Sequence, residues 1–238
     1  MYSLTPRVLK VQDSNNCEDI IKEAASIVLE GGLVVYPTDT SYGLACDPRQ
    51  EDAMERLVNA KRRERHLGIP LLFSDLTQCE VYHEFANLEK ILAKMFWPGA
   101  LTLVVIASST VPKHVASGRN SIAVRVPDHA IPRGMANEIG APISGTSANI
   151  SGEESPFDID TALKQLGDIV DLYIDDGPSK SRLNSTIVGV EEAGMGEEPL
   201  NIKVYREGEI TINELTDRLK VDSDALKSWT MRIVYADK

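Results

Sequence analysis

The residues best suited to chemistry in this chain form three polar clusters, two of which directly follow strand-like apolar runs. Residues 38–41 (TDTS) follow the apolar run 33–36, and residues 145–152 (GTSANISG) follow residues 142–144. Between them lies a basic cluster, KRRER, at residues 61–65. In an α/β sheet, residues just past the carboxyl ends of strands line the ligand crevice. The hydroxyls, amide and cations therefore predict a site for a polar, anionic small molecule.

The basic cluster has two readings. It comes at the end of a predicted helix, where the helix dipole favours cations in any protein, so it could be an ordinary solvated face. On a continuing helix Lys61 and Arg63 would diverge, whereas in an extended or turning segment they would point the same way. Gly68 and Pro70 indicate that the helix stops nearby, and this favours an anion site.

The other two clusters also have an ordinary alternative. Thr38, Asp39 and Thr40 could form a turn held by local side-chain-to-backbone hydrogen bonds, or they could recognise an ammonium or hydroxyl group. Residues 145–152 could be a plain loop of small residues, or their backbone N–H groups could form an anion-binding nest.

Several common catalytic motifs are missing from the sequence. There is no Walker loop and no dinucleotide-binding fingerprint, and Ser147 does not lie in a G-x-S-x-G nucleophile elbow. The four histidines show no metal-ligand spacing; they are His66, His83, His114 and His129. We therefore expect any metal to be Mg²⁺ that arrives with substrate phosphates.

The order of the apolar patterns predicts an α/β protein. Helical spacing predicts helices at residues 17–30, 52–61, 87–96, 131–139 and from 211 onward. Extended apolar runs predict strands at residues 33–36, 69–73, 101–107, 122–126, 172–174, 185–190 and 202–206. Residues beyond about 222 could add a helix and a strand or form a tail. Alternating units followed by consecutive late strands predict a mixed sheet covered by helices.

Composition narrows the class further. The 238 residues, 42% of them hydrophobic, can bury the core of one large domain, with or without an appendage. A net charge of −11 opposes a surface that binds nucleic acid by charge alone. The three cysteines are widely spaced with no CxxC pair, which is typical of inert thiols in a reducing compartment. No apolar run approaches the ~20 residues that span a bilayer, so we expect a cytoplasmic protein without a membrane partner.

Six motifs occur in an order that resembles the YrdC family, the threonylcarbamoyl-AMP synthases. They are the segments 36–44 (YPTDTSYGL), 61–63 (KRR), 96–99 (FWPG), 124–129 (VRVPDH), 146–152 (TSANISG) and 185–186 (ST). Each motif alone is weak, but six in order over residues 15–210 are specific. The resemblance implies a YrdC-like catalytic domain at residues 1–210 and a C-terminal extension of unknown role at residues 211–238. It also implies a twisted mixed sheet flanked by helices, with a concave basic cavity.

The reaction implied by this resemblance joins L-threonine, bicarbonate or CO₂, and ATP into threonylcarbamoyl-AMP, with release of pyrophosphate. The product is the donor for threonylcarbamoyladenosine in tRNA, and other proteins complete that transfer. A carbamate oxygen attacks the α-phosphorus, so the site must align two anions and relieve their repulsion. No protein nucleophile is needed for this step.

The resemblance also assigns roles to individual residues. Lys61 and Arg63 would be catalytic cations, and L-threonine would be held by Thr38, Arg125 and Ser185. The nucleotide would be bound by Lys61, Arg65, Ser121, Ser147, Asn149, Ser155 and Arg206, and Mg²⁺ would come with ATP. One departure is Glu64, which stands where the family usually has a proline. Because neither catalytic cation belongs to an apolar face, we expect Lys61→Ala and Arg63→Ala to change thermal stability little.

Two other functions fit parts of the pattern. One is an RNA-binding module in ribosome or tRNA maturation, but the acidic charge and 5% aromatic content oppose it. The other is a carbamoyl-transfer enzyme of the kind fused into hydrogenase maturation proteins, but neither an acylphosphatase-like segment nor zinc-finger cysteines occur here. We therefore expect no direct RNA ligand, and any RNA binding to be weak at physiological salt and displaced by ATP.

Overall fold

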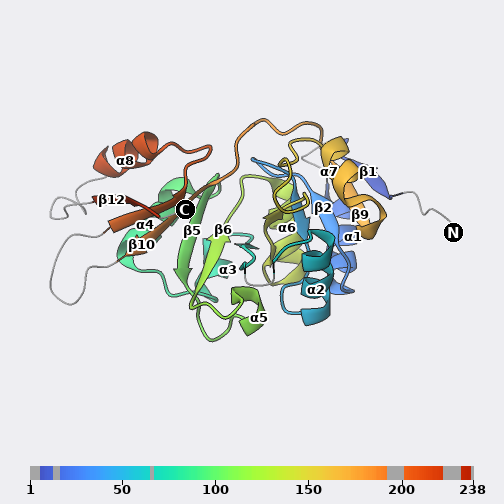
Figure 1. Ribbon diagram of the computed structural model, residues 1–238, viewed down its shortest axis with the longest axis horizontal. Helices are drawn as coiled ribbons and strands as arrows, with labels where there is room; N and C mark the ends of the chain where they lie inside the picture. Colours follow the sequence, from blue (N-terminus) through green and yellow to red (C-terminus); the bar gives the residue numbers. More distant parts are fainter. Residues whose placement is uncertain (1–5, 13–16, 65–66, 192–200, 222–231, 237–238) are drawn as a thin grey trace.

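The fold consists of two twisted β-sheets with helices packed on them (Figure 1). The structure is a computed structural model that describes residues 6–12, 17–64, 67–191, 201–221 and 232–236. Both sheets contain parallel and antiparallel strand pairs. The mixed α/β fold predicted from the sequence is therefore confirmed.

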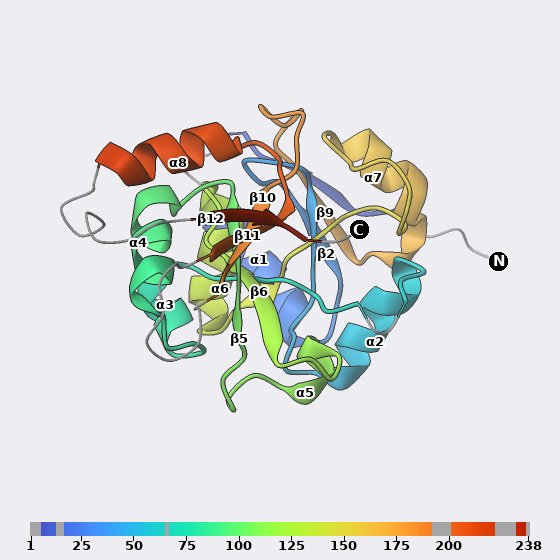
Figure 2. The ribbon, with the colours of Figure 1, turned by 60° about the vertical axis from the view of Figure 1, so that its left-hand side comes forward.

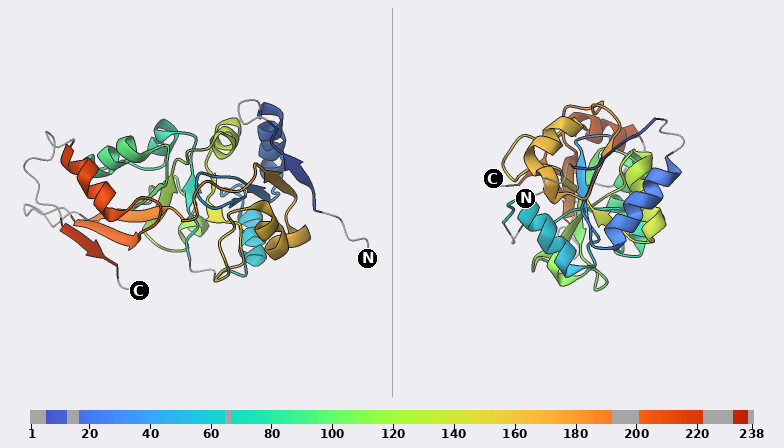
Figure 3. Two further views of the ribbon diagram at one scale, coloured as in Figure 1. Left: turned by 90° about the horizontal axis from the view of Figure 1, so that it is seen from above. Right: turned by 90° about the vertical axis from the view of Figure 1, so that its right-hand side faces the viewer.

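The five-stranded sheet has the strand order β1-β9-β2-β3-β8. Its strands are β1 (Val8–Lys10), β2 (Val34–Tyr36), β3 (Gly43–Ala45), β8 (Thr146–Ser147) and β9 (Leu172–Asp175). Every residue of β2 and β3 is buried, which explains the continuous apolar run in the sequence before residue 37. The helices at this end of the molecule are α1 (Glu18–Leu29), α2 (Glu51–Ala60) and α7 (Ile159–Leu166), with the 3₁₀ turn η1 (Gly167–Ile169) after α7 (Figure 3).

The seven-stranded sheet has the order β12-β11-β10-β5-β6-β4-β7. Its strands are β4 (Leu71–Leu72), β5 (Leu101–Ile106), β6 (Ser121–Arg125), β7 (Ile143–Ser144), β10 (Thr186–Glu191), β11 (Asn201–Arg206) and β12 (Arg232–Tyr235). The remaining helices are α3 (Leu76–Glu80), α4 (Asn87–Phe96), α5 (Lys113–Ala116), α6 (Ala130–Ile139) and α8 (Ile212–Val221). Figure 2 shows α3, α4 and α8 grouped on one side of this sheet.

Helices α1 and α6 pack closely against each other. A Cβ atom at Gly134 of α6 would lie 2.5 Å from Cδ1 of Ile21 in α1, so the glycine leaves room for the Ile21 side chain. The predicted helices 17–30 and 131–139 are thereby confirmed, and their apolar faces meet in a second core cluster beside β2 and β9.

The elements that sequence patterns did not predict are mostly short. Strands β3 and β8 and helices α3 and α5 have two to five residues each, too few to show a period. Helix α7 is longer and begins with a capped turn, in which the side chain of Asp158 accepts a hydrogen bond from the Thr161 N–H. Its eight residues lie in a region for which the sequence patterns predicted no helix or strand.

The described parts of the predicted C-terminal extension belong to the core and to the seven-stranded sheet. Leu215 and Leu219 of α8 are fully buried in the same core cluster as Phe96. The guanidinium of Arg218 lies 5.0 Å from the centre of the Phe96 ring. Strand β12 pairs in parallel with β11 and forms the edge of the sheet.

No helix in the described part of the chain is long and apolar enough to cross a membrane.

The packing of α8 predicts a measurable contribution to stability. Leu215→Ala should lower the free energy of unfolding by about 2–5 kcal/mol, because it leaves a cavity in the core. Lys220→Ala, on the exposed side of the same helix, should change it by less than about 0.5 kcal/mol. Urea unfolding of the two variants measures both effects. Equal midpoints for Leu215→Ala and the unmodified protein would show that α8 does not contribute to the core.

Candidate functional site

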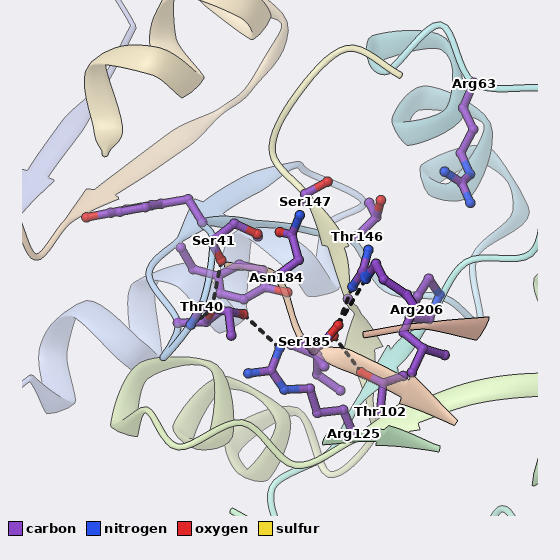
Figure 4. A pocket seen from close by; sticks show the side chains of 18 residues that line it. Thr40, Ser41, Arg63, Thr102, Arg125, Thr146, Ser147, Asn184, Ser185 and Arg206 are labelled. Carbon is purple, nitrogen blue, oxygen red and sulfur yellow. Dashed lines mark hydrogen bonds between the residues drawn. The ribbon is translucent and has the colours of Figure 1, made fainter. Parts of the chain in front are cut away.

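A cavity of about 200 Å³ lies between the two sheets. Its wall combines the ends of β2, β3 and β8 from one sheet with residues of β4, β5, β6, β10 and β11 from the other (Figure 4). The residues that line it are Tyr36, Thr38, Thr40, Ser41, Tyr42, Gly43, Arg63, Pro70, Leu72, Thr102, Arg125, Gly145, Thr146, Ser147, Asn184, Ser185, Ile187 and Arg206. The three polar clusters identified in the sequence thus contribute to one cavity.

The wall of this cavity is basic. It carries the guanidinium groups of Arg63, Arg125 and Arg206, and none of the described lining residues is a carboxylic acid. The chain as a whole has a net charge of −11, so positive charge is concentrated here against the overall balance. Such a cavity favours an anionic ligand.

Arg125, at the end of β6, is the most firmly held of the three arginines. It is 6% exposed, and its Nε donates to the carbonyl of Gly99 at 2.9 Å. Nη1 donates to Oγ1 of Thr40 at 2.9 Å, and Nη2 donates to Oδ1 of Asp39 at 2.5 Å. The loop after β2 therefore fixes the guanidinium plane and supplies a carboxylate beside it.

The hydroxyls of the loop after β2 bond to one another and to the backbone. Oγ1 of Thr38 donates to the Ser41 carbonyl at 2.8 Å and accepts from the Thr40 N–H at 2.9 Å. The local turn that the sequence allowed is therefore present. Both threonines also line the cavity, so the turn presents them to a ligand.

A second hydroxyl network joins β5 and β11 through Ser185, the residue directly before β10. Oγ of Ser185 lies 2.9 Å from Oγ1 of Thr102 and accepts from Nη2 of Arg206 at 3.1 Å. Nε of Arg206 donates to the Ser185 carbonyl at 2.9 Å, while its Nη1 has no acceptor among the described residues. Burial, and then the nearby charge of Arg125, lowers the pKa of Arg206. An anion between these two guanidiniums would relieve their repulsion.

Lys61 lies beneath the site and does not line the cavity. Its side chain is 1% exposed, and Nζ donates to the carbonyl of Ser147 and to the carbonyl of Asn149 at 2.7 Å. A longer contact of 3.4 Å joins Nζ to Oδ1 of Asn149. Burial, followed by the charge of Arg63, lowers the pKa of Lys61 to about 7, whereas the three oxygens around it favour the charged form. Lys61 ties the end of α2 to the loop after β8.

Arg63 is separated from Lys61 by a turn and reaches the cavity. Arg62 adopts φ 49°, in the left-handed region, and this ends the helical path after α2. Nη2 of Arg63 donates to the Gly68 carbonyl at 3.0 Å. Burial, and then the charge of Arg119, lowers the pKa of Arg63. The sequence correctly predicted that the helix stops here, but the two cations end in different surroundings.

The loop after β8 is tightly self-bonded. Oγ of Ser147 lines the cavity and donates to Oδ1 of Asn149 at 2.5 Å. The Nδ2 group of Asn149 donates to the carbonyls of Ile150 and Glu153 at 3.0 and 2.9 Å, so this amide holds the loop and is buried behind it. Oγ of Ser155 accepts from Nδ2 of Asn184 at 3.0 Å without lining the cavity.

Neither of two other expected nucleotide contacts, Ser121 and Arg65, is among the described residues that line the cavity. Ser121 begins β6, four residues before Arg125, and does not line the cavity. Arg65 lies outside the described residues, so its predicted contact stays a prediction. The neighbouring Glu64, which replaces the usual proline, is exposed.

Sequence reasoning missed two polar residues of the wall. Thr102 is a single hydroxyl inside the apolar strand run 101–107, and it is 3% exposed. A polar side chain at a buried strand position needs a hydrogen-bond partner. This isolated threonine in an apolar run could therefore have been recognised from the sequence as a candidate residue of the site. Asn184 precedes Ser185 directly and had no comparable signal in the sequence.

The fold and this cavity define an α/β protein with an arginine-lined cavity between its sheets, and comparison with known proteins identifies its family. The family model described as telomere recombination (Sua5, YciO and YrdC) matches residues 26–208. A threonylcarbamoyl-AMP synthase of Hydrogenovibrio crunogenus is 40% identical over 140 residues, which cover 56% of this chain and 74% of that protein. A threonylcarbamoyl-AMP synthase of Idiomarina loihiensis is 32% identical over 188 residues, which cover 78% of this chain and 96% of that protein. The chain belongs to the Sua5, YciO and YrdC family, as the sequence resemblance implied.

A solved structure supports the same assignment. The crystal structure of Pyrococcus abyssi Sua5 complexed with L-threonine superposes with a TM-score of 0.79 at 28% sequence identity. The alignment covers 95% of this chain, which spans 62% of the length of the P. abyssi chain.

The burial of Lys61 corrects the expectation that its loss would leave stability unchanged. Lys61→Met keeps the aliphatic stem but leaves the carbonyls of Ser147 and Asn149 without their donor. It should therefore lower the free energy of unfolding by about 1–3 kcal/mol. Arg63→Ala, which removes a half-buried side chain at the cavity wall, should cost less than Lys61→Met. Chemical unfolding of the pair checks this order, and an equal or larger loss in Arg63→Ala would contradict it.

Proposed function

We propose that this chain is a threonylcarbamoyl-AMP synthase that uses L-threonine, bicarbonate or CO₂, and ATP. The observation that carries the proposal is the arginine-lined cavity between the sheets, because the two reacting groups, a carbamate and a phosphate, are both anions. The names of the relatives and the threonine bound in P. abyssi Sua5 support the same activity.

The proposed reaction has two steps. The amine of threonine attacks the carbon of bicarbonate or CO₂, losing a proton, and forms a carbamate; with bicarbonate, water leaves. A carbamate oxygen then bonds to the α-phosphorus of ATP, the bond from that phosphorus to the bridging oxygen breaks, and pyrophosphate leaves. The protein contributes alignment and charge, and both effects are large where donors are fixed in advance and partly shielded from water.

Threonine is assigned to the part of the cavity next to the loop after β2. Arg125 is fixed there by Asp39 and Thr40, and it retains N–H groups beyond the three that bond within the protein. Thr38 and Ser185 place hydroxyls on the same wall. A guanidinium with two hydroxyls suits an amino acid that carries a carboxylate and a side-chain hydroxyl.

The nucleotide phosphates are assigned to Arg63, Arg206 and the loop that carries Ser147. Nη1 of Arg206 has no acceptor among the described residues, and Figure 4 shows Arg63 at the upper right, on the same side of the view as Arg206. Lys61 stabilises this loop because its ammonium donates hydrogen bonds to the carbonyls of Ser147 and Asn149. In this proposal Arg63 faces the phosphates, and Lys61 is a positioning residue.

Mg²⁺ is proposed to enter with ATP. In the described part of the chain, no group of three or more histidine, cysteine, aspartate or glutamate side chains could hold a metal ion. The hydroxyls of the wall fit a hydrated ion that is bound mainly by phosphate oxygens. When bound, such an ion would offset charge on the leaving pyrophosphate.

The product would serve tRNA modification as the activated donor for threonylcarbamoyladenosine. Separate transfer proteins would complete that step. The three cysteines are free and buried, which supports a location in the cytoplasm.

Pyrophosphate release tests the proposed function directly. The purified chain should release pyrophosphate from ATP only when both threonine and bicarbonate are present. Arg63→Ala should lower turnover at least tenfold, because it removes a cation facing phosphate. Lys113→Ala, which changes a lysine outside the cavity, is the control and should keep full turnover. Release that is independent of threonine, or normal turnover in Arg63→Ala, would contradict the assignment.

The hydroxyls of the wall predict a preference among amino acids. Threonine should be favoured over serine by roughly tenfold to a hundredfold through a methyl contact, and 2-aminobutyrate should be poorer still. The reason is that 2-aminobutyrate leaves a protein hydroxyl unpaired in the cavity. The ratios of kcat/KM for the three amino acids measure this. If the kcat/KM for 2-aminobutyrate equalled that for threonine, the site would not recognise the hydroxyl of the substrate.

A further inference from the structure

The chain segment at the start of β10 is held on two sides. Asn184 and Ser185 line the cavity, whereas the next residue, Thr186, is fully buried and lies outside the set of lining residues. From the cavity side, the guanidinium of Arg206 donates to the carbonyl of Ser185 at 2.9 Å and to its Oγ at 3.1 Å. From the other side, the segment contacts the connection between β11 and α8, residues 207–211. The position of Ser185 thus depends on both contacts.

The hydroxyl of Thr186 is the main link to this connection. Oγ1 donates to the carbonyl of Ile210 and accepts from the N–H groups of Gly208 and Ile210 at 2.9 and 3.1 Å. A hydroxyl has one proton and two lone pairs, so all of its hydrogen-bonding capacity is used. The two partner residues lie 22 and 24 residues further along the chain. A valine at position 186 would keep the shape of the side chain but leave these backbone groups without their partner.

Gly208 allows the connection to lie directly against the backbone of Asn184 and Ser185. A Cβ atom at position 208 would lie 2.1 Å from the carbonyl oxygen of Asn184 and 2.8 Å from that of Ser185. The next residue, Glu209, donates its N–H to the Asn184 carbonyl at 2.9 Å. Because the atoms that an added Cβ would meet belong to the backbone, any side chain at position 208 would displace one segment from the other.

The connection is in turn anchored in the core. Oε1 of Glu207 accepts from the N–H of Ile212, the first residue of α8, at 3.0 Å. The side chains of Ile210 and Ile212 are buried in the main core cluster together with Leu215 and Leu219 of α8. The connection is therefore a fixed support for the start of β10.

Both contacts with the start of β10 come from one continuous stretch of chain. Arg206 ends β11 and pairs with Ile187 of β10, and residues 207–210 follow it directly. The guanidinium of Arg206 lies on the cavity side of Ser185, while the backbone that follows is bonded to Thr186. Loss of the Thr186 hydroxyl would release this backbone, and the Arg206 side chain would lose its fixed position.

We propose that Thr186 is a positioning residue that fixes Arg206 and Ser185 relative to each other at the cavity wall. Helix α8 serves the site through the same bonds, because it anchors the connection that Thr186 holds. This inference rests on the proposed function, which assigns phosphate to Arg206 and threonine to Ser185. A reacting group that is misplaced by about 1 Å can cost about a hundredfold in rate, so a buried hydroxyl behind the wall can matter as much as one that faces the cavity.

Calorimetric titration of the full chain with inorganic tripolyphosphate tests the placement of Arg206 without relying on the reaction. Thr186→Val should bind this anion about tenfold more weakly than the unmodified protein, and Thr186→Ser, which keeps the hydroxyl, should bind it within about twofold. Leu166→Ala is the control, because it removes a buried side chain of α7 beside the other sheet. It should lower the urea midpoint and leave tripolyphosphate binding within about twofold.

Steady-state kinetics test the placement of Ser185. In Thr186→Val the kcat/KM for threonine should fall at least tenfold, and Thr186→Ser should restore it to within about threefold. Gly208→Ala opposes the same contact from the side of the connection and should resemble Thr186→Val in both measurements. If Thr186→Val did not fold, Gly208→Ala would decide the question.

The outcomes separate the role of Thr186 from the proposed function. Normal tripolyphosphate binding in folded Thr186→Val overturns the positioning role, even if the unmodified protein is an active synthase. Equal weakening in Leu166→Ala overturns it as well, because the effect would then follow from lost stability. Failure of the unmodified protein to bind tripolyphosphate would remove the anion site and the proposal with it. Weakening that is confined to Thr186→Val and Gly208→Ala supports the role, and if pyrophosphate release were then independent of threonine, only the synthase would be rejected.

Discussion

The guanidinium of Arg125 joins the two sheets at the wall of the cavity. It extends from the end of β6 in the seven-stranded sheet, and its partners Asp39 and Thr40 follow β2 in the five-stranded sheet. A buried charge of this kind is costly unless it is paired and hydrogen-bonded, and loss of one partner of such a pair typically costs about 3–5 kcal/mol. The relative position of the two sheets, and hence the width of the cavity, therefore depends on this interaction.

Lys61 performs a comparable task on the other side of the cavity. A buried ammonium holds the carbonyls of the loop after β8, and the loop in turn presents Ser147 to the cavity. The site is thus framed by two buried cations, each satisfied by oxygens from a distant part of the chain. Arg63 and Arg206 are less fully bonded within the protein, which leaves them suited to a ligand.

The fold could be predicted from the sequence where apolar patterns were long. The runs at residues 33–36 and 101–107 became β2 and β5, and the helical pattern before Gly140 became α6. Strands of two or three residues, such as β8, carried no period and depended on pairing with β3. The β-bulge in the pairing of β10 with β11 could not be predicted, because it exists in the register between the two strands and in neither strand alone. Likewise, Lys61 and Arg63 look equivalent in the sequence. They differ in the structure because Lys61 donates to the carbonyls of Ser147 and Asn149, which are 86 and 88 residues away along the chain.

The hydroxyl pair of Thr102 and Ser185 has a consequence for a substrate that changes its hydrogen-bonding character. Either hydroxyl of the pair can donate to the other across 2.9 Å. When Thr102 donates, the proton of Ser185 is free to turn toward the cavity and to stabilise an anionic oxygen. When Ser185 donates, its second lone pair can accept from an ammonium, while the first accepts from Arg206. Rotation of two protons thus lets one arrangement of heavy atoms accept from an ammonium or donate to an anionic oxygen.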